Sequence, residues 1–257
     1  MSYEFITVDK QDHIWVVTIN RPERMNALHP PANHEMGLAF DEFAADGDAW
    51  VAILTGAGER SFSAGNDLKV AASGETFEGL NVSRGFGGIE KRFDLFKPVI
   101  AAVNGSCLGG GFHMALGCDL IIAAEHATFG LPESRLGRAP ATGMHVLPRI
   151  LPHYLAMDLL LTGRPIGAKE AYRIGLVNQV VPKGELLDAA IRKAKVIAEC
   201  APLAVQLTKQ ARLVHHLPLQ EALAAKLPLT DVVAESEDRV EGPKAFVQKR
   251  PPQWKGR

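Results

Sequence analysis

Residues 98–124 decide the fold, and they read PVIAAVNGSCLGGGFHMALGCDLIIAA. The stretch begins with an apolar, partly β-branched run, which predicts a strand that Asn104-Gly105 closes. A glycine run then opens a short helix from about Gly111, and residues 119–124 predict the next strand. Strands as apolar as these are typical of sheets that are covered on both faces. The order of strand, helix and strand therefore predicts an α/β fold.

The same alternation continues on both sides of this stretch. Residues 14–19 and 50–54 predict strands, and apolar residues at helical spacing predict a helix over residues 32–45. Beyond about residue 167 the strand signal fades, and the pattern predicts one more strand over 176–181 and helices over 185–199, 203–214, 219–234 and 238–249. We expect Asp238 to cap the last helix and residues 69–84 to form a surface loop. The chain thus divides into an α/β core over residues 1–184 and a helical region over residues 185–257.

Composition excludes several classes of protein. The 257 residues carry 28 Lys and Arg against 29 Asp and Glu, so the basic excess of a nucleic-acid-binding protein is absent. Three scattered cysteines do not make a disulfide framework and fit a reducing compartment. The N-terminal segment lacks the apolar region of a signal peptide, and no apolar run reaches the roughly 18 residues of a membrane span. We expect a soluble cytoplasmic protein.

Familiar catalytic and cofactor motifs are missing from the sequence. No Gly-Lys dipeptide is present, which excludes the phosphate loop that ends in Gly-Lys. The spacing of cysteines and histidines predicts no zinc site, and no metal is expected. The segment SFSAG at residues 61–65 lacks the first glycine of a serine-hydrolase nucleophile turn.

Two glycine-containing turns after apolar strands remain as candidates for a site. They are FSAGNDL at residues 62–68 and NGSCLGGGFH at residues 104–113. Small residues let a ligand approach the backbone, and a glycine run that opens a helix leaves N–H groups unpaired. Two such N–H groups from separate turns can form an oxyanion hole. The alternative interpretation is two tight turns in which glycine serves only steric needs.

Four segments together resemble the enoyl-CoA hydratase/isomerase (crotonase) family. They are RPERMNAL at residues 21–28, FSAGNDL at 62–68, the stretch from AAVNGSCLGGG to LPESRLG at 101–137, and AFVQKRPPQWKGR at 245–257. The resemblance implies a spiral of ββα units, followed by C-terminal helices that support trimers or hexamers. It implies an acyl-CoA thioester as substrate, with no separate cofactor. We expect the subunit interface to include the apolar C-terminal positions Leu219, Leu223, Leu227, Val232 and Val233.

The resemblance also implies how the thioester is bound. Its carbonyl oxygen is expected between the backbone N–H groups of Ala64 and Gly110. The 3′-phospho-ADP part of coenzyme A is expected near Arg24. The pantetheine is expected to pass residues that line the same segment, namely Ala27, Ala64, Gly65, Asn66, Asp67 and Leu68.

One catalytic position matches the family and one departs from it. Glu133 occupies one of the family's two catalytic glutamate positions, whereas His113 stands where typical hydratases carry the other glutamate. A neutral imidazole could take a proton from water while Glu133 acts as the acid. The alternative is a histidine that merely fills space. Residues 136–145 depart as well, since Ala141 and Met144 replace usual glycines and Arg138 adds a charge.

The leading hypothesis is therefore hydration of a 2-enoyl-CoA to a 3-hydroxyacyl-CoA. A Δ3,Δ2-enoyl-CoA isomerase that uses Glu133 alone is the runner-up. Other reactions of a thioester enolate and a non-catalytic acyl-CoA-binding role complete the alternatives.

Overall fold

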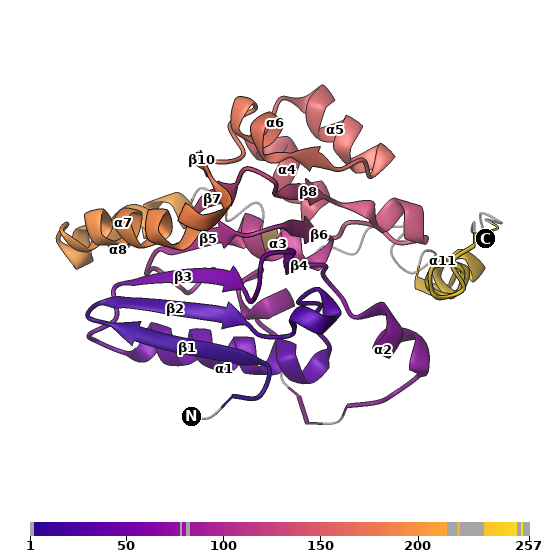
Figure 1. The fold of residues 1–257 in the computed structure, drawn as a ribbon, viewed down its shortest axis with the longest axis horizontal. Helices are drawn as coiled ribbons and strands as arrows, with labels where there is room; N and C mark the ends of the chain where they lie inside the picture. The colour runs from indigo at the N-terminus through magenta and orange to yellow at the C-terminus, as the bar shows by residue number, and fades with distance from the viewer. Residues whose placement is uncertain are drawn as a thin grey trace.

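A computed structural model describes residues 3–77, 79–80, 83–214, 220–221, 234–250 and 253 (Figure 1). Its larger sheet has six strands in the order β1-β2-β3-β5-β7-β10. Their bounds are Ile6–Gln11, Ile14–Ile19, Val51–Gly56, Val99–Val103, Leu120–Ala124 and Gln179–Val181. β1 runs antiparallel to β2, and every other neighbouring pair is parallel.

A smaller sheet has the order β4-β6-β8-β9, with bounds Ser61–Ser63, Ser106–Leu108, Thr128–Gly130 and Ile166–Gly167. The successive pairs β3 and β4, β5 and β6, and β7 and β8 each give one strand to each sheet. A helical segment follows each pair: α2 (Leu68–Ser73), α3 (Gly110–Gly117), and the 3-10 helix η3 (Pro132–Leu136) with α4 (Gly143–Ile150). This repetition confirms the predicted α/β spiral of ββα units.

The larger sheet is buried on both faces, as its apolar strands predict. α1 (Pro30–Ala45) packs on one face, where Phe40 and Phe43 join Trp15 and Leu54 in the main core. α7 (Leu186–Ala198) covers the other face, where its alanines meet the alternate residues of the same strands, such as Ile53. The first helix of the region expected from residue 185 is therefore part of the α/β core.

The remaining described elements connect or flank these layers. They are α5 (His153–Thr162), α6 (Ala168–Arg173), α8 (Pro202–Val214), α11 (Glu237–Val247) and the 3-10 helices η1 (Pro22–Arg24), η2 (Phe86–Gly88) and η4 (Lys183–Glu185). α11 lies far from α7 and α8 and packs against α2 and η3 (Figure 1). No helix within the described ranges is both long and apolar enough to cross a bilayer.

The structure corrects two local predictions. The expected loop at 69–84 begins as helix α2, because the Asp67 side chain accepts hydrogen bonds from the N–H groups of Lys69 and Val70. The cap of α11 is Ser236 rather than Asp238, since Ser236 accepts from the N–H of Arg239 at 3.2 Å.

The helix predicted over 219–234 lies almost wholly outside the described residues. So do the five apolar positions expected at a subunit interface.

Two buried asparagines hold the turns that carry the chain from one sheet to the other. Asn104 Nδ2 donates to the carbonyls of Gly56 and Gly58 at 2.7 and 2.6 Å. Asn26 Nδ2 donates to the carbonyls of Ala57 and Ser61 at 3.0 and 2.7 Å. Buried carbonyls need partners, so these amides fix the path that leads into β4 and β6.

The start of α3 touches the end of β4 without any side chain between them. A Cβ on Gly111 would lie 2.2 Å from the backbone oxygen of Ser63, and a Cβ on Gly65 would lie 2.7 Å from the nitrogen of Gly110. Both distances are below van der Waals contact. Glycine at these positions is therefore a condition for bringing the two turns together.

We expect Gly111→Ala to lower the free energy of unfolding by about 2–3 kcal/mol. Intrinsic helix propensity favours alanine over glycine by about 1 kcal/mol. A fall in the free energy of unfolding must therefore come from the steric clash with Ser63. The matched control is Gly37→Ala in α1, where a Cβ meets no atom within 4 Å. The control should be neutral or stabilising. Equal thermal midpoints for the two variants would contradict the close approach.

Candidate active site

The first turn of α3 presents backbone donors at the meeting point of the two turns. The N–H of Gly110 has no hydrogen-bond partner within the described part of the chain, as is usual for the first residues of a helix. The other turn, at residues 62–68, does not offer the expected N–H group of Ala64. The N–H of Ala64 donates to the carbonyl of Met25 at 3.0 Å, and that of Gly65 donates to Ser63 Oγ at 3.1 Å. The donor predicted at Ala64 is therefore already used.

The unused donor of this turn belongs to Asn66. The N–H of Leu28 donates to the carbonyl of Gly65 at 2.8 Å, and the N–H of Asp67 donates to the carbonyl of Leu28 at 3.0 Å. This parallel bridge turns the intervening N–H of Asn66 away from Leu28. Among the described residues it has no partner, and Asn66 itself is exposed.

An ion pair fixes the segment that the resemblance assigns to coenzyme A. Arg21 lies 3.2 Å from Asp67, both side chains are buried, and Arg21 also donates to the carbonyl of Ala27. The Asp67 carboxylate is thus engaged by Arg21 and by the N-terminus of α2. Arg24 is exposed at the end of η1, and Leu68 is half-buried as the first residue of α2.

The structure brings His113 and Glu133 together. His113 lies in the first turn of α3 and Glu133 in η3, and His113 Nε2 is 3.7 Å from Glu133 Oε1. A Cβ on Gly109 would lie 3.3 Å from that same oxygen, so the Glu133 carboxyl rests directly on the glycine run. The two side chains are 8% and 15% exposed. They form a largely buried pair of titratable groups next to the glycine run that carries the free N–H of Gly110.

Glu90 is a third member of this cluster, and sequence reasoning missed it. His113 Nδ1 lies 3.2 Å from Glu90 Oε1. The Thr142 hydroxyl donates to the same oxygen, and the N–H of Phe86 donates to Glu90 Oε2 at 2.8 Å. Glu90 lies in no recognisable motif, and Thr142 lies in the segment 136–145 that departs from the family pattern. Only the folded chain brings both to His113.

The two carboxyl groups have opposite electrostatic surroundings. Burial by itself raises the pKa of Glu90. The hydrogen bond and the charge attraction of His113, together with hydrogen bonds from Phe86 and Thr142, outweigh burial and lower the pKa to about 2. Burial also raises the pKa of Glu133, where the attraction of His113 opposes it only in part. Glu90 is therefore held as a carboxylate, whereas Glu133 is suited to carry a proton.

Two buried polar atoms of the cluster have spare hydrogen-bonding capacity. Within the described residues, neither His113 Nε2 nor Glu133 Oε2 has a hydrogen-bond partner. Buried polar atoms without partners are costly and are most often found where a ligand or water takes part. The described part of the chain contains no cluster of His, Cys, Asp and Glu suited to a metal ion. The chemistry that this arrangement supports is proton transfer.

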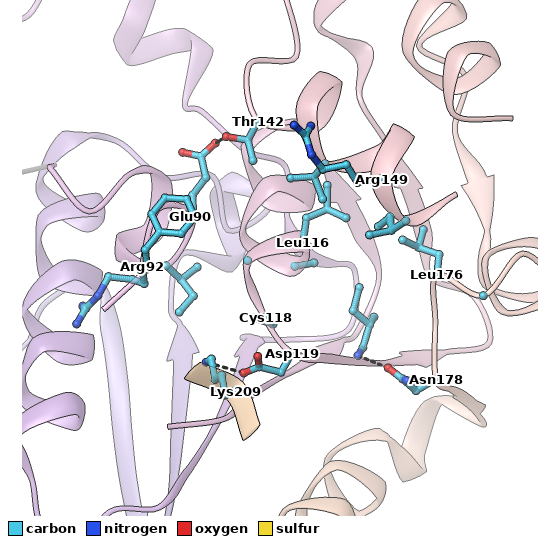
Figure 2. Close-up of a pocket in the computed structure, with 18 residues that line it drawn as sticks. Glu90, Arg92, Leu116, Cys118, Asp119, Thr142, Arg149, Leu176, Asn178 and Lys209 are labelled. Atoms are coloured by element: carbon cyan, nitrogen blue, oxygen red, sulfur yellow. Dashed lines mark hydrogen bonds and ion pairs between the residues drawn. The ribbon is translucent and has the colours of Figure 1, made fainter. Parts of the chain in front are cut away.

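A cavity of about 230 Å³ adjoins the cluster (Figure 2). Glu90 and Thr142 line one end, and the Asp119–Lys209 ion pair, 2.7 Å long, lies at the other. Its walls combine apolar side chains, such as Leu116 from α3 and Leu176, with charged ones, such as Arg149. His113 does not line this cavity. The hydrogen-bonded side chains of Glu90 and Thr142 form part of the wall between the cavity and His113.

Comparisons with known proteins identify the family and the fold. The family model of enoyl-CoA hydratase/isomerase matches residues 9–257. Carnitinyl-CoA dehydratase of Shigella flexneri is 44% identical over 260 residues, which covers 99% of both chains. Carnitinyl-CoA hydratase from Mycobacterium avium has a crystal structure 37% identical in sequence, with a TM-score of 0.91 over 100% of both chains. Enoyl-CoA hydratase from Mycobacterium tuberculosis is 37% identical, with a TM-score of 0.76 over 98% of this chain and 99% of the other.

The family match extends over nearly the whole chain, and the fold agrees over its full length. The chain therefore belongs to the enoyl-CoA hydratase/isomerase family.

Proposed function

We propose that this protein catalyses the reversible addition of water to the double bond of a 2-enoyl-CoA thioester. The observation that carries the proposal is the pair of buried, unpartnered atoms His113 Nε2 and Glu133 Oε2 beside the free N–H of Gly110. Hydration needs one group that takes a proton from water and another that gives a proton to carbon. The relatives named as carnitinyl-CoA dehydratase and hydratase support a reaction of this type on an acyl-CoA.

The thioester carbonyl oxygen is proposed to bind between the N–H groups of Gly110 and Asn66. Addition of water places negative charge on this oxygen, and two fixed donors stabilise the charge by on the order of 3 kcal/mol each. Gly110 opens helix α3, whose dipole adds to the effect. The support is that these two N–H groups are unused among the described residues, whereas that of Ala64 is not.

The two side chains divide the proton transfers. His113 Nε2 takes one proton as the water oxygen bonds to the β-carbon, and the electrons of the double bond move toward the carbonyl oxygen. Glu133 then gives its proton to the α-carbon, which restores the thioester. Burial raises the pKa of Glu133, which favours its protonated form relative to that of an exposed carboxyl group.

The remaining parts of the resemblance stand as proposals. Coenzyme A is proposed to bind with its phosphates near Arg24 and its pantetheine along Ala27, Gly65 and Leu68. Because coenzyme A is part of the substrate, the chemistry requires no separate cofactor. Assembly into trimers or hexamers through the C-terminal helices, and a cytoplasmic location, belong to the same proposal.

We expect purified protein to convert crotonyl-CoA into 3-hydroxybutyryl-CoA with uptake of oxygen from ¹⁸O-labelled water. His113→Ala should lower kcat for hydration about 100-fold or more, within the usual range for a general base. Glu133→Gln should abolish hydration and double-bond movement alike, because both need a proton moved at the α-carbon. Exposed Glu75→Gln is the matched control and should retain full activity.

Mass spectrometry of the products distinguishes the alternatives. If the double bond of 3-enoyl-CoA moves and no substrate takes up label, the protein is an isomerase and the proposed hydration is wrong. If His113→Ala hydrates crotonyl-CoA as fast as the unmodified protein, His113 is only a packing residue. Parallel assays with carnitinyl-CoA test whether the acyl group named for the relatives is also accepted here.

We expect the stability of the protein to record the raised pKa of Glu133. The folded protein holds this proton more tightly than the unfolded chain, so the stabilisation is complete below about pH 4.5 and is lost as pH rises through the raised value. Glu133→Gln removes this loss, so it should raise the thermal midpoint at pH 7 and raise it less at pH 4. Calorimetry at both pH values, with Glu75→Gln as control, measures the difference. A gain that does not depend on pH would contradict the assignment.

A further inference from the structure

We propose that Glu90 is a positioning residue that fixes His113 with its proton on Nδ1 and its lone pair on Nε2, directed toward Glu133 and the substrate. The catalytic consequence rests on the proposed hydration, whereas the tautomer itself can be tested without substrate.

The Glu90 carboxylate is held by groups other than His113. The N–H of Phe86 donates to Oε2 at 2.8 Å, and the Thr142 hydroxyl donates to Oε1. The side chain is 8% exposed, so water competes little for its oxygens. Phe86 is itself fixed, because a Cβ on Gly110 would lie 2.6 Å from its ring. Contacts other than the one with His113 therefore hold the Glu90 carboxylate in place as a hydrogen-bond acceptor.

This acceptor decides which nitrogen of His113 carries the proton. An ionised carboxylate can only accept, so His113 Nδ1, 3.2 Å from Glu90 Oε1, must be the donor. The opposite tautomer would set a nitrogen lone pair against a carboxylate oxygen. In the neutral imidazole, Nε2 is then the basic atom, and it is the atom left without a partner 3.7 Å from Glu133.

The same contact stabilises the protonated state of the reaction. When Nε2 takes a proton from water, the new imidazolium faces the Glu90 carboxylate, which remains ionised throughout. Glu133 has meanwhile lost its proton to the α-carbon. Transfer of the proton from His113 Nε2 to Glu133 Oε1, across the 3.7 Å gap or through one water, restores both groups. One water is added and no net proton is consumed.

Glu90→Gln is a sharp test because the amide has only one favourable orientation. The N–H of Phe86 is an obligate donor, so the amide oxygen must face it. The amide NH2 then faces His113 Nδ1, while the Thr142 hydroxyl can turn to accept. A donor opposite Nδ1 requires the proton of His113 to move to Nε2. The substitution should therefore reverse the tautomer without changing the shape of the side chain.

The tautomer is read by NMR of ¹⁵N-histidine-labelled protein, with the His113 signals assigned through His113→Ala. In the neutral form of the unmodified protein we expect Nδ1 to be protonated and Nε2 to be bare. In Glu90→Gln we expect the reverse, together with a fall in kcat for crotonyl-CoA hydration of about 100-fold or more and a KM within about threefold. The matched control is Glu35→Gln. Glu35 also accepts two backbone N–H groups, those of Glu4 and Phe5, but lies away from His113.

Three results would overturn the proposal. They are a neutral His113 with its proton on Nε2 in the unmodified protein, an unchanged tautomer in Glu90→Gln, or a kcat in that variant within twofold of the original. If Glu90→Gln does not fold, Thr142→Val removes one anchor and leaves the carboxylate; it should keep the Nδ1 proton, and a reversed tautomer there also refutes the role. The expected tautomers in a protein that hydrates no enoyl-CoA would support the positioning role and refute the proposed function.

Discussion

The close contact between the end of β4 and the start of α3 is the constraint on which the site depends. Gly111 lies against the backbone of Ser63, and Gly65 lies against the nitrogen of Gly110, with no room for a Cβ at either glycine. This contact brings the turn that carries the unused N–H of Asn66 against the residue that carries the unused N–H of Gly110. It also fixes the direction of α3, and with it the position of His113 in the first helical turn. The same contact therefore positions the unused N–H group of Gly110 and the proposed base His113.

A second consequence concerns the two carboxyl groups on either side of His113. Both are buried, yet Glu90 receives hydrogen bonds from three groups, whereas Glu133 Oε2 receives none among the described residues. Burial alone raises the pKa of both, so the donors make the difference. Paired titratable groups whose surroundings separate their pKa values are typical of acid–base catalysis. The fold creates this asymmetry with one backbone N–H, one hydroxyl and one imidazole.

The sequence predicts the fold and two members of the cluster, His113 and Glu133. It does not predict Glu90 and Thr142, and the reason is physical. Apolar strands and the glycine run at Gly109 are local signals, and the resemblance identifies Glu133 and His113 from their motif positions. Glu90 has no such signal, because its role comes from tertiary contacts with Phe86 and Thr142. The choice between the N–H groups of neighbouring turn residues also depends on a distant partner: the carbonyl of Met25 uses the N–H of Ala64, and the bridge to Leu28 leaves that of Asn66 unused.

The histidine at position 113 is electrostatically compatible with the carboxylate at position 90, whereas a glutamate there would not be. A glutamate at position 113, as the family usually carries, would bring a second carboxyl group against buried Glu90, and like charges so close cannot both ionise. One of them would hold a proton that hydration does not use. An imidazole avoids this conflict, because it donates from Nδ1 to Glu90 while Nε2 stays free to accept from water. The departure from the family pattern therefore keeps the proposed base facing Glu133. It replaces one carboxylate by a histidine, which, in our proposal, the anchored Glu90 carboxylate orients.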